Sequence, residues 1–325
     1  MQNISKINCK IWSRLGQRGT FFGVALPEIA AENALVWVLT ADLADLSGLA
    51  RFQNAFPERF VNVGIAEQNM LGIAAGLAKE GNTVFATTYA TFIAMRSFEQ
   101  IRHNLGYQQV NVKVVGSAAG MVMGMSGNTH YAFEDLAIMR AIPGMTVVSP
   151  ADATEAYKLA WAAAADPRPM YIRLTGGLNC ASVYDSEYEF VIGKAVTMRE
   201  GKDLAIIASG TMVREAIMAA EILETRGVSA EVINMHTIKP IDAETIIRVA
   251  SEKKLIVTVE EHNTLGGLGS AVAEVKSTVS SEAAQLFIGV PDTFTKAATY
   301  EYLLERFGLK AEMIAEKILM KIESL

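Results

Sequence analysis

Glu67 lies where a carboxylate could meet a ligand. A strand is predicted to end at Val63, the chain turns at Gly64, and Glu67 then enters the first turn of a helix predicted over residues 66–79. The helix dipole favours a carboxylate at that end, and the glycines and alanines that follow allow close packing. Ligands of open α/β sheets bind near the carboxyl ends of strands. Glu67 is therefore a candidate ligand contact, with a merely solvated carboxylate as the alternative.

An aromatic pair follows along the chain. Tyr89 and Phe92 are three residues apart, with Phe85 and Phe98 outside them. At a helix start this spacing can present a flat aromatic surface on one side. Such a surface stacks well on a planar heterocycle. Ordinary core packing is the alternative for these rings.

A glycine- and methionine-rich loop contains the third candidate, His130. The loop delivers Ser126-Gly127-Asn128-Thr129-His130 just before a predicted helix, and the chain has only four histidines. A histidine on such a loop is a plausible substrate contact. The neighbouring methionines more often fill gaps in packing than bind a ligand.

The elements that must position these residues alternate between strand and helix. Strands buried on both faces and joined by right-handed crossovers build a parallel sheet covered by helices. The predicted strands are residues 36–40, 83–87, 110–115, 146–149 and 171–174, and the predicted helices are 66–79, 92–104, 133–141 and 153–165. We therefore expect an α/β fold with a parallel sheet in the first domain.

A polar stretch without periodicity, residues 175–189, predicts a linker. We expect a first domain over residues 1–184 and a second, smaller α/β domain over residues 185–325. Its predicted strands are 204–208, 230–234, 255–259 and 286–288, and its predicted helices are 213–225, 243–251 and 270–277, with two more after Pro291. The glycine-rich run 262–270 is interpreted as a tight strand-to-helix turn, and His236 and His262 as structural or interfacial residues.

Composition narrows the class of protein. The chain has 325 residues, 51% of them hydrophobic, and a net charge of −6 without a basic stripe, which argues against nucleic acid or an anionic membrane as a partner. Its apolar runs are far shorter than the ~20 residues of a membrane span. The start of the chain does not resemble a signal peptide. Cys9 and Cys180 are expected to be thiols in a reducing compartment, so a cytoplasmic location is predicted.

Taken in order, these segments resemble the transketolase family over nearly the whole chain. The motifs RFVNVGIAEQNMLGIAAGLA, GNTH followed by ED, and IPGMTVVSPADATEA are similar to the family's pyrimidine-binding domain. The motifs VINMHTIKPID, VTVEEHNTLGGLGSAVAE and IGVPDTF are similar to its C-terminal domain. The resemblance implies that residues 1–184 form the pyrimidine-binding domain and residues 185–325 the transketolase C-terminal domain.

The resemblance also implies a role for each candidate. Glu67 matches the glutamate that hydrogen-bonds the pyrimidine nitrogen of thiamine diphosphate and so activates the cofactor. Tyr89 and Phe92 match the aromatic pair that stacks on the pyrimidine, and Asp42 and Leu43 match positions that line the cofactor pocket. His130 matches a histidine that contacts substrate oxygens.

Full-length family members carry a further N-terminal domain that holds the diphosphate through Mg²⁺ and a GDG…N motif. No GDG occurs in this sequence. The resemblance therefore implies that a separate pyrophosphate-domain subunit supplies that domain and the metal, and that this chain holds no metal itself. The expected assembly is a heterodimer or an α₂β₂ heterotetramer.

The sequence departs from the family at its phosphate contacts. Ser126 replaces an aspartate, Gly176 replaces a phosphate-binding arginine, and Ala118 and Ala119 occupy positions where a basic contact is common. Glycine cannot replace an arginine that binds phosphate in a bidentate manner. Other arginines that could reach in are Arg173, Arg96 and Arg18. We expect His130, Ser126 and Arg173 at the substrate, which we predict is not an ordinary ketose phosphate bound in the usual way.

The leading hypothesis is transfer of a two-carbon ketol unit from a ketose to an aldehyde. The alternative is a 2-oxo acid decarboxylating component, either a dehydrogenase E1 β-type subunit or a deoxyxylulose-phosphate-synthase-like enzyme. A third hypothesis is a regulatory or structural paralogue without substrate chemistry. The retained Glu67, Tyr89, Phe92 and His130 argue against that third hypothesis.

Overall fold

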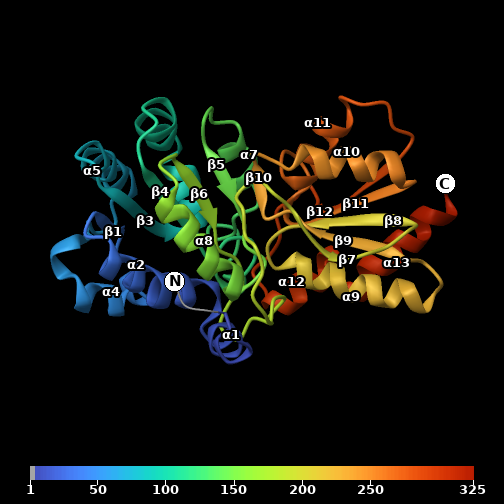
Figure 1. Ribbon diagram of the computed structural model, residues 1–325, viewed down its shortest axis with the longest axis horizontal. Coiled ribbons are helices and arrows are strands. Elements are labelled where there is room, and N and C mark those ends of the chain that lie inside the picture. The colour runs from blue at the N-terminus through green and yellow to red at the C-terminus, as the bar shows by residue number, and fades with distance from the viewer. Residues whose placement is uncertain (1–3) are drawn as a thin grey trace.

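Two α/β domains lie side by side in the computed structural model, which describes residues 4–325 (Figure 1). The expected fold class is confirmed. In the first domain the elements are α1 (Lys6–Thr20), η1 (Phe21–Ala25), α2 (Leu26–Glu32), β1 (Val36–Thr40), α3 (Ala44–Ser47), α4 (Ala50–Ala55), η2 (Pro57–Arg59), β2 (Phe60–Asn62), α5 (Glu67–Lys79), β3 (Thr83–Tyr89), η3 (Phe92–Arg96), α6 (Phe98–Gln100), η4 (Ile101–Tyr107), β4 (Val112–Ser117), η5 (Gly124–Ser126), α7 (Asp135–Arg140), β5 (Thr146–Val148), α8 (Ala153–Ala165) and β6 (Met170–Arg173).

The first sheet has the strand order β10-β5-β6-β4-β3-β1-β2, and all its pairs except β10 with β5 are parallel. Strands β3 to β6 are buried along their whole length, as expected for a parallel sheet covered on both faces. The carboxyl ends of these strands therefore meet at one edge.

The edge strand β10 comes from the other half of the sequence. Thr237–Lys239 pairs antiparallel with β5, with Thr237 opposite Val148. Residues 237–239 fall in the expected second domain, and no strand was predicted there, so β10 is an unpredicted strand of the first sheet. The two domains share a hydrogen-bonded strand edge.

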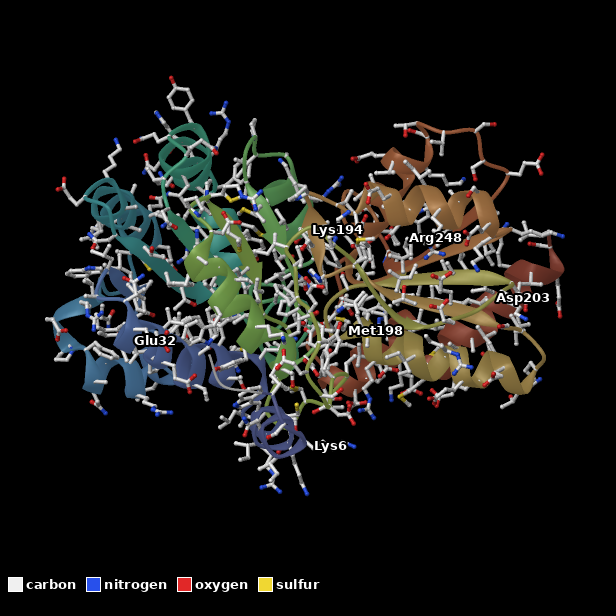
Figure 2. The ribbon with its side chains drawn as sticks, viewed as in Figure 1. Lys6, Glu32, Lys194, Met198, Asp203 and Arg248 are labelled. Atoms are coloured by element: carbon white, nitrogen blue, oxygen red, sulfur yellow. The ribbon has the colours of Figure 1, made fainter. Side chains whose placement is uncertain are left out.

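The second domain has a five-stranded sheet with the order β12-β11-β8-β9-β7. Its only antiparallel pair is β7 with β9. Arg248 pairs with the buried Glu231 of the sheet at 2.5 Å, and Figure 2 labels Arg248 on the helix above it. The remaining elements are β7 (Val196–Arg199), β8 (Leu204–Ala208), α9 (Met212–Thr225), β9 (Ala230–Asn234), β10 (Thr237–Lys239), α10 (Ala243–Glu252), β11 (Leu255–Asn263), α11 (Leu268–Lys276), β12 (Ala284–Val290), α12 (Tyr300–Phe307) and α13 (Ala311–Glu323).

Helices before β1, which the sequence did not predict, cover one face of the first sheet. Helix α1 packs along α8, and Trp12 stacks on Tyr157 with ring centroids 4.3 Å apart. Helix α1 kinks at Gly16, which has a φ of 70°, and a Cβ there would overlap the carbonyl oxygen of Gly177. The kink therefore brings α1 against the loop that follows β6.

The helix expected over residues 92–104 is interrupted. Two π-helical segments, η3 and η4, flank the single turn α6, and Ser97 between them has φ −107° and ψ 18°. The interruption places Phe92 and Arg96 in one short segment after β3. Segments of this kind are frequent at functional sites.

The polar segment between the domains contains no helix or strand over residues 174–195. Its path is fixed by Asp152, which caps α8 by accepting the Glu155 N–H at 2.8 Å. The other Asp152 oxygen accepts the N–H groups of Val183 and Tyr184 at 2.7 and 3.0 Å. The predicted helix over residues 153–165 is confirmed, while the division at residues 184 and 185 stays a prediction.

Candidate active site

The expected site residues lie at the carboxyl edge of the first sheet, where all of them except Arg173, whose side chain takes other partners, form the candidate site. Each follows or ends a different strand of the parallel array, which is the arrangement that builds ligand sites in open α/β folds. In chain order they are Asp42 and Leu43 after β1, Glu67 after β2, Tyr89 at the end of β3 with Phe92 just beyond it, Ser126 and His130 after β4, and Arg173 at the end of β6.

Three rings form an aromatic cluster: Tyr89, Phe92 and His130. The centroids of Tyr89 and Phe92 are 5.7 Å apart, and the imidazole of His130 lies 5.8 Å from Tyr89 and 5.2 Å from Phe92. His130 Nδ1 is 2.9 Å from Thr129 Oγ1, so the hydroxyl orients the imidazole. The cluster therefore brings together the segment around the end of β3, which carries Tyr89 and Phe92, and the loop after β4, which carries His130.

Glu67 is the first residue of α5, and its side chain is 3% exposed. No side chain caps this helix, so the carboxylate itself lies at the positive end of the dipole. Its Oε1 accepts a hydrogen bond from Nη1 of Arg96 at 2.5 Å. The Arg96 guanidinium carbon lies 4.5 Å from the centroid of Phe92. Arg96 thus joins the carboxylate to the aromatic cluster.

Asn62 connects the loop after β1 with the turn after β2, which leads into Glu67. Its Oδ1 accepts the backbone N–H groups of Asp42 and Gly64, both at 3.0 Å. Asp42 has a φ of 60°, a left-handed conformation that aspartate tolerates better than most residues. The loop with Asp42 and Leu43 is therefore tied to the turn that leads into Glu67. Sequence reasoning missed Asn62, although a polar residue at the end of a strand is a usable signal.

The loop that carries Ser126 and His130 is anchored in the second domain. Thr295 N donates to Asn128 Oδ1 at 3.2 Å, and Asn128 Nδ2 donates to the Thr295 carbonyl. Tyr131 donates its hydroxyl to the Gly124 carbonyl at 2.5 Å. Ser126 is exposed at the end of the 3-10 turn η5.

Arg173 does not join this group. It is 2% exposed, pairs with Asp135 at 2.8 Å, and donates to the carbonyl oxygens of Ala132 and Glu261 at 2.9 Å. Burial is the largest single influence on the pKa of this guanidinium and lowers it, but Asp135, Glu261 and Tyr171 together raise the pKa overall. A buried charge needs such partners. Arg173 therefore links the two domains, and this placement does not fit the expected contact with substrate.

The positions of the missing phosphate contacts carry no cation. Ala118 and Ala119 are buried, and Ala118 has a φ of 53°. Gly176 has a φ of 76°, and a Cβ there would point at Thr211 of the second domain. Arg18 approaches from α1: it donates to the Leu46 carbonyl at 3.2 Å, and burial lowers its pKa while the nearby Tyr89 opposes that shift.

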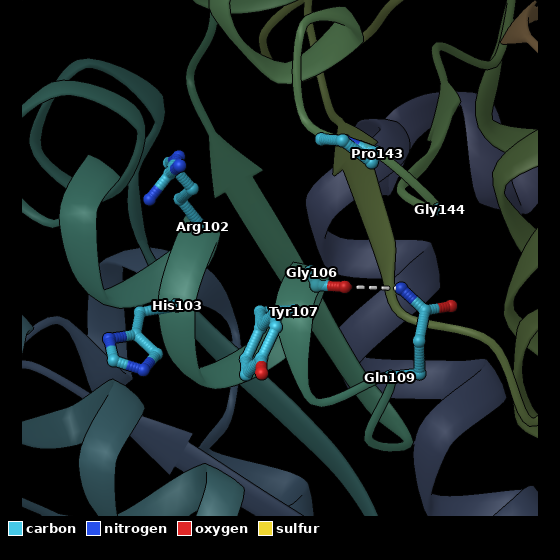
Figure 3. A pocket seen from close by; sticks show the side chains of 7 residues that line it. All are labelled: Arg102, His103, Gly106, Tyr107, Gln109, Pro143 and Gly144. Atoms are coloured by element: carbon cyan, nitrogen blue, oxygen red, sulfur yellow. Dashed lines mark hydrogen bonds between the residues drawn. The ribbon is translucent and has the colours of Figure 1, made fainter.

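A separate surface hollow of about 620 Å³ is lined by Arg102, His103, Gly106, Tyr107, Gln109, Pro143 and Gly144 (Figure 3). These residues precede β4 and β5, so the hollow lies at the amino ends of those strands. In Figure 3, Gln109 donates to the Gly106 carbonyl across it. The hollow is therefore at the opposite edge of the sheet from Glu67.

Within residues 4–325 the structure groups no three histidine, cysteine, aspartate or glutamate side chains that could hold a metal ion. Among the same residues, none of the helices combines the length and apolar character that a membrane crossing requires.

The structure has two α/β domains in series with candidate site residues at the carboxyl edge of the first sheet, and the comparisons with known proteins assign each domain to a family. The pyrimidine-binding domain of transketolase matches residues 18–180, and the transketolase C-terminal domain matches residues 193–314. The chain belongs to the transketolase family.

Its relatives include separate C-terminal subunits. A putative transketolase C-terminal section from Methanocaldococcus jannaschii is 41% identical over 93% of this chain and 95% of its own length. A 6-deoxy-6-sulfo-D-fructose transketolase subunit from Clostridium sp. is 41% identical over 91% of both chains. A solved structure described as a split gene transketolase, inactive beta4 tetramer, superposes with a TM-score of 0.84 at 40% identity, over 94% of this chain and 97% of that one.

The alternative family branch is also represented. A 1-deoxy-D-xylulose-5-phosphate synthase from Caldanaerobacter subterraneus is 35% identical over 94% of this chain. This chain spans 49% of that enzyme's length. The similarity to the split subunits, in contrast, covers more than 90% of both chains.

Proposed function

We propose that this chain is the pyrimidine-binding and C-terminal subunit of a split, thiamine-diphosphate-dependent transketolase-like enzyme. The enzyme transfers a two-carbon ketol unit from a ketose to an aldehyde, and this chain is active only together with a partner subunit. The observation that carries the proposal is the buried Glu67 carboxylate at the start of α5, which Arg96 links to the ring of Phe92, the neighbour of His130 in the aromatic cluster.

The residues at this edge fit an aminopyrimidine. The Glu67 carboxyl group is 3% exposed, and a buried group of this kind needs a hydrogen-bonding partner, which within this chain is Arg96. The ring nitrogen of an aminopyrimidine is an acceptor that can share a proton with such a carboxyl group, and Tyr89 and Phe92 offer aromatic faces on which the ring can stack. When bound, thiamine diphosphate supplies the carbon nucleophile that accepts the ketol unit.

Each side chain of this chain then has a defined task. Glu67 hydrogen-bonds the ring nitrogen and holds the shared proton there. Tyr89 and Phe92 orient the ring, while Asp42 and Leu43 close the pocket from the β1 loop. His130, held by Thr129, donates to the substrate oxygen that gains charge in the reaction.

The partner supplies what this chain lacks. We propose a subunit with a pyrophosphate-binding domain that holds the diphosphate through Mg²⁺, an oxygen-liganded cation, in a heterodimer or α₂β₂ heterotetramer. The relative described as an inactive beta4 tetramer supports this, since that protein is inactive as an assembly of one chain type. Two buried or half-buried thiols, Cys9 and Cys180, support a reducing, cytoplasmic location.

The substrate departs from the usual ketose phosphate. Gly176 and Ala118 leave the usual phosphate positions without a cation, and Arg173 is committed to Asp135. Arg18 remains to meet an anionic group near Tyr89. The relative from Clostridium acts on a sulfonated sugar by name, which supports a sulfonated or otherwise modified ketose as substrate here.

The decisive experiment uses the complex of this chain with its pyrophosphate-domain partner. Deuterium exchange at C2 of bound thiamine diphosphate is measured for the native complex and for Glu67→Gln and Glu67→Ala. We expect exchange to slow by about 100-fold or more, since a positioned acid–base group contributes factors of this size. Unchanged exchange would contradict the proposal and favour the paralogue without substrate chemistry.

A second experiment separates ketol transfer from the alternative. The same complex is supplied either with a ketose and an aldehyde or with pyruvate, and CO₂ release is followed. Transfer without CO₂ supports the transketolase-like reaction. Pyruvate-dependent CO₂ release assigns the chain to the 2-oxo acid decarboxylating enzymes, which the similarity to deoxyxylulose-phosphate synthases keeps as the second candidate.

A further inference from the structure

One guanidinium group, that of Arg96, makes two contacts at once. Its Nη1 donates to Glu67 Oε1 at 2.5 Å, and its central carbon lies 4.5 Å from the centroid of the Phe92 ring. In this one position, the guanidinium therefore both lies over the Phe92 ring and pairs with the Glu67 carboxylate.

These are the two contacts that the proposed function gives to the cofactor's aminopyrimidine. A guanidinium is planar, delocalised and rich in N–H donors, and it stacks on aromatic rings and pairs with carboxylates. The aminopyrimidine shares this shape and this pairing. Both groups cannot occupy Glu67 Oε1 and the covered face of Phe92 together.

The surroundings allow the side chain of Arg96 to leave while its backbone stays. Its side chain is 47% exposed, whereas that of Glu67 is 3% exposed. The Arg96 carbonyl accepts a hydrogen bond from Gln68 Nε2 of α5 at 3.0 Å, which clamps the backbone. Rotation of the Arg96 side chain toward solvent would uncover Phe92 and Glu67 without refolding the segment.

The pairing of Arg96 with Glu67 also stabilises the chain when no cofactor is bound. A carboxylate buried without a counter-ion is strongly destabilising, and Glu67 would be in that state if Arg96 were absent and no ligand were bound. We propose that Arg96 is a placeholder for the aminopyrimidine: it occupies Glu67 and Phe92 in the chain without cofactor, and binding of the cofactor requires it to move out. This inference rests on the proposed function.

The test measures binding and not turnover. The isolated chain and the complex with its partner are titrated with thiamine diphosphate, and the isolated chain also with 4-amino-5-hydroxymethyl-2-methylpyrimidine, by calorimetry. Arg96→Met removes the N–H donors and the charge. Arg102→Met is the matched control, because Arg102 is an exposed arginine of η4 at the far edge of the sheet.

We expect Arg96→Met to bind both ligands about 5- to 20-fold more tightly than the native chain, and Arg102→Met to bind like the native chain. Without ligand, Arg96→Met should unfold at lower urea concentration, and adding Glu67→Gln should restore most of that loss. Weaker or unchanged binding by Arg96→Met overturns the inference, since a residue that helps hold the cofactor would give that result.

Arg96→Lys is a second variant in case Arg96→Met does not fold. It keeps the charge but loses the planar cover of Phe92, so we expect tighter binding than native by a smaller factor; equal or weaker binding again overturns the inference. The proposed function fails in a different way. It fails if Glu67→Gln leaves deuterium exchange at C2 of thiamine diphosphate bound to the complex unchanged, whatever the Arg96 variants do.

Discussion

Glu261 Oε1 accepts the backbone N–H of Met121 at 2.6 Å, so a buried carboxylate of the second domain holds the loop that leads to His130. The other Glu261 oxygen accepts the hydroxyl groups of Thr211 and Tyr300, both at 2.9 Å. Burial raises the pKa of Glu261. The position of the proposed substrate contact therefore depends on packing between the two domains.

Gly120 is where this dependence can be tested. A Cβ at Gly120 would overlap Glu261 Oε1, and its φ of 70° disfavours any L side chain. We predict that Gly120→Ala lowers the free energy of unfolding by about 1–3 kcal/mol through strain and overpacking. Urea denaturation of the isolated chain measures the first effect, and the transfer activity of the complex should fall as the loop shifts.

Gly76→Ala is the matched control for that variant. Gly76 lies inside α5 with open space around its missing side chain. Alanine there should raise the free energy of unfolding of the isolated chain by about 0.5–1 kcal/mol, because glycine is a poor helix former. Equal stability of the two variants would contradict the packing argument.

His130 should affect the reaction more than cofactor binding. The imidazole contacts Tyr89 and Phe92 by its edges and is oriented by Thr129. We predict that His130→Ala lowers kcat of the complex by about 100- to 1,000-fold, the usual effect of losing a donor to developing charge. Thiamine diphosphate affinity, measured by calorimetry, should change much less.

The exposed His103 provides the comparison. It lies in the hollow at the opposite edge of the sheet, so His103→Ala should leave kcat as it is. A loss of thiamine diphosphate affinity in His130→Ala as large as its loss of kcat would show that the imidazole serves the cofactor and not the substrate.

Arg18 should discriminate substrates by charge. We predict that Arg18→Met raises KM for a sulfonated or phosphorylated ketose by about 10- to 100-fold, since hydrogen bonds to charged groups contribute roughly 1.5–3 kcal/mol. KM for an uncharged ketose should not change. Arg14→Met is the control, because Arg14 is exposed on the same helix. Equal effects of Arg18→Met on charged and uncharged ketoses would rule out an anion contact.

Much of the fold was predictable because its strands are short apolar runs buried on both faces. The strands Val36–Thr40, Leu204–Ala208 and Ala230–Asn234 have the predicted bounds, and so does the helix Ala153–Ala165. The pairing of Thr237–Lys239 with the first sheet was not predictable, because three residues carry no periodicity and the partner strand is remote in sequence.

The candidate site was predictable where a residue's position on a strand end decides its place. Tyr89, Phe92 and His130 meet for that reason, and Arg96 links Glu67 to Phe92. The arginines were not predictable, because each takes a partner that lies far along the chain. Arg173 pairs with Asp135 and Arg96 with Glu67. The residues around each arginine do not indicate which partner it takes.

His236 should make stability depend on pH in a defined direction. It is fully buried in the segment between β9 and β10, its Nδ1 lies 2.8 Å from Thr237 Oγ1, and its ring packs on Phe190 at 4.5 Å. Burial lowers the pKa of His236 to about 4, although Asp242 opposes the shift. The His236 imidazole therefore binds a proton near pH 6.5 in the unfolded chain but only near pH 4 in the folded chain.

Because the unfolded state binds more protons in that window, this group's contribution to stability is complete above about pH 6.5 and is lost as the pH falls toward 4. The loss is about 3 kcal/mol for a shift of this size. We predict that His236→Gln, which cannot titrate, loses correspondingly less stability between pH 7 and pH 4.5 than the native chain. Urea denaturation of the native chain and of His236→Gln at each pH measures the difference in their free energies of unfolding. The carboxylates common to both chains, Asp152 among them, do not contribute to this difference. Parallel pH profiles would contradict the prediction.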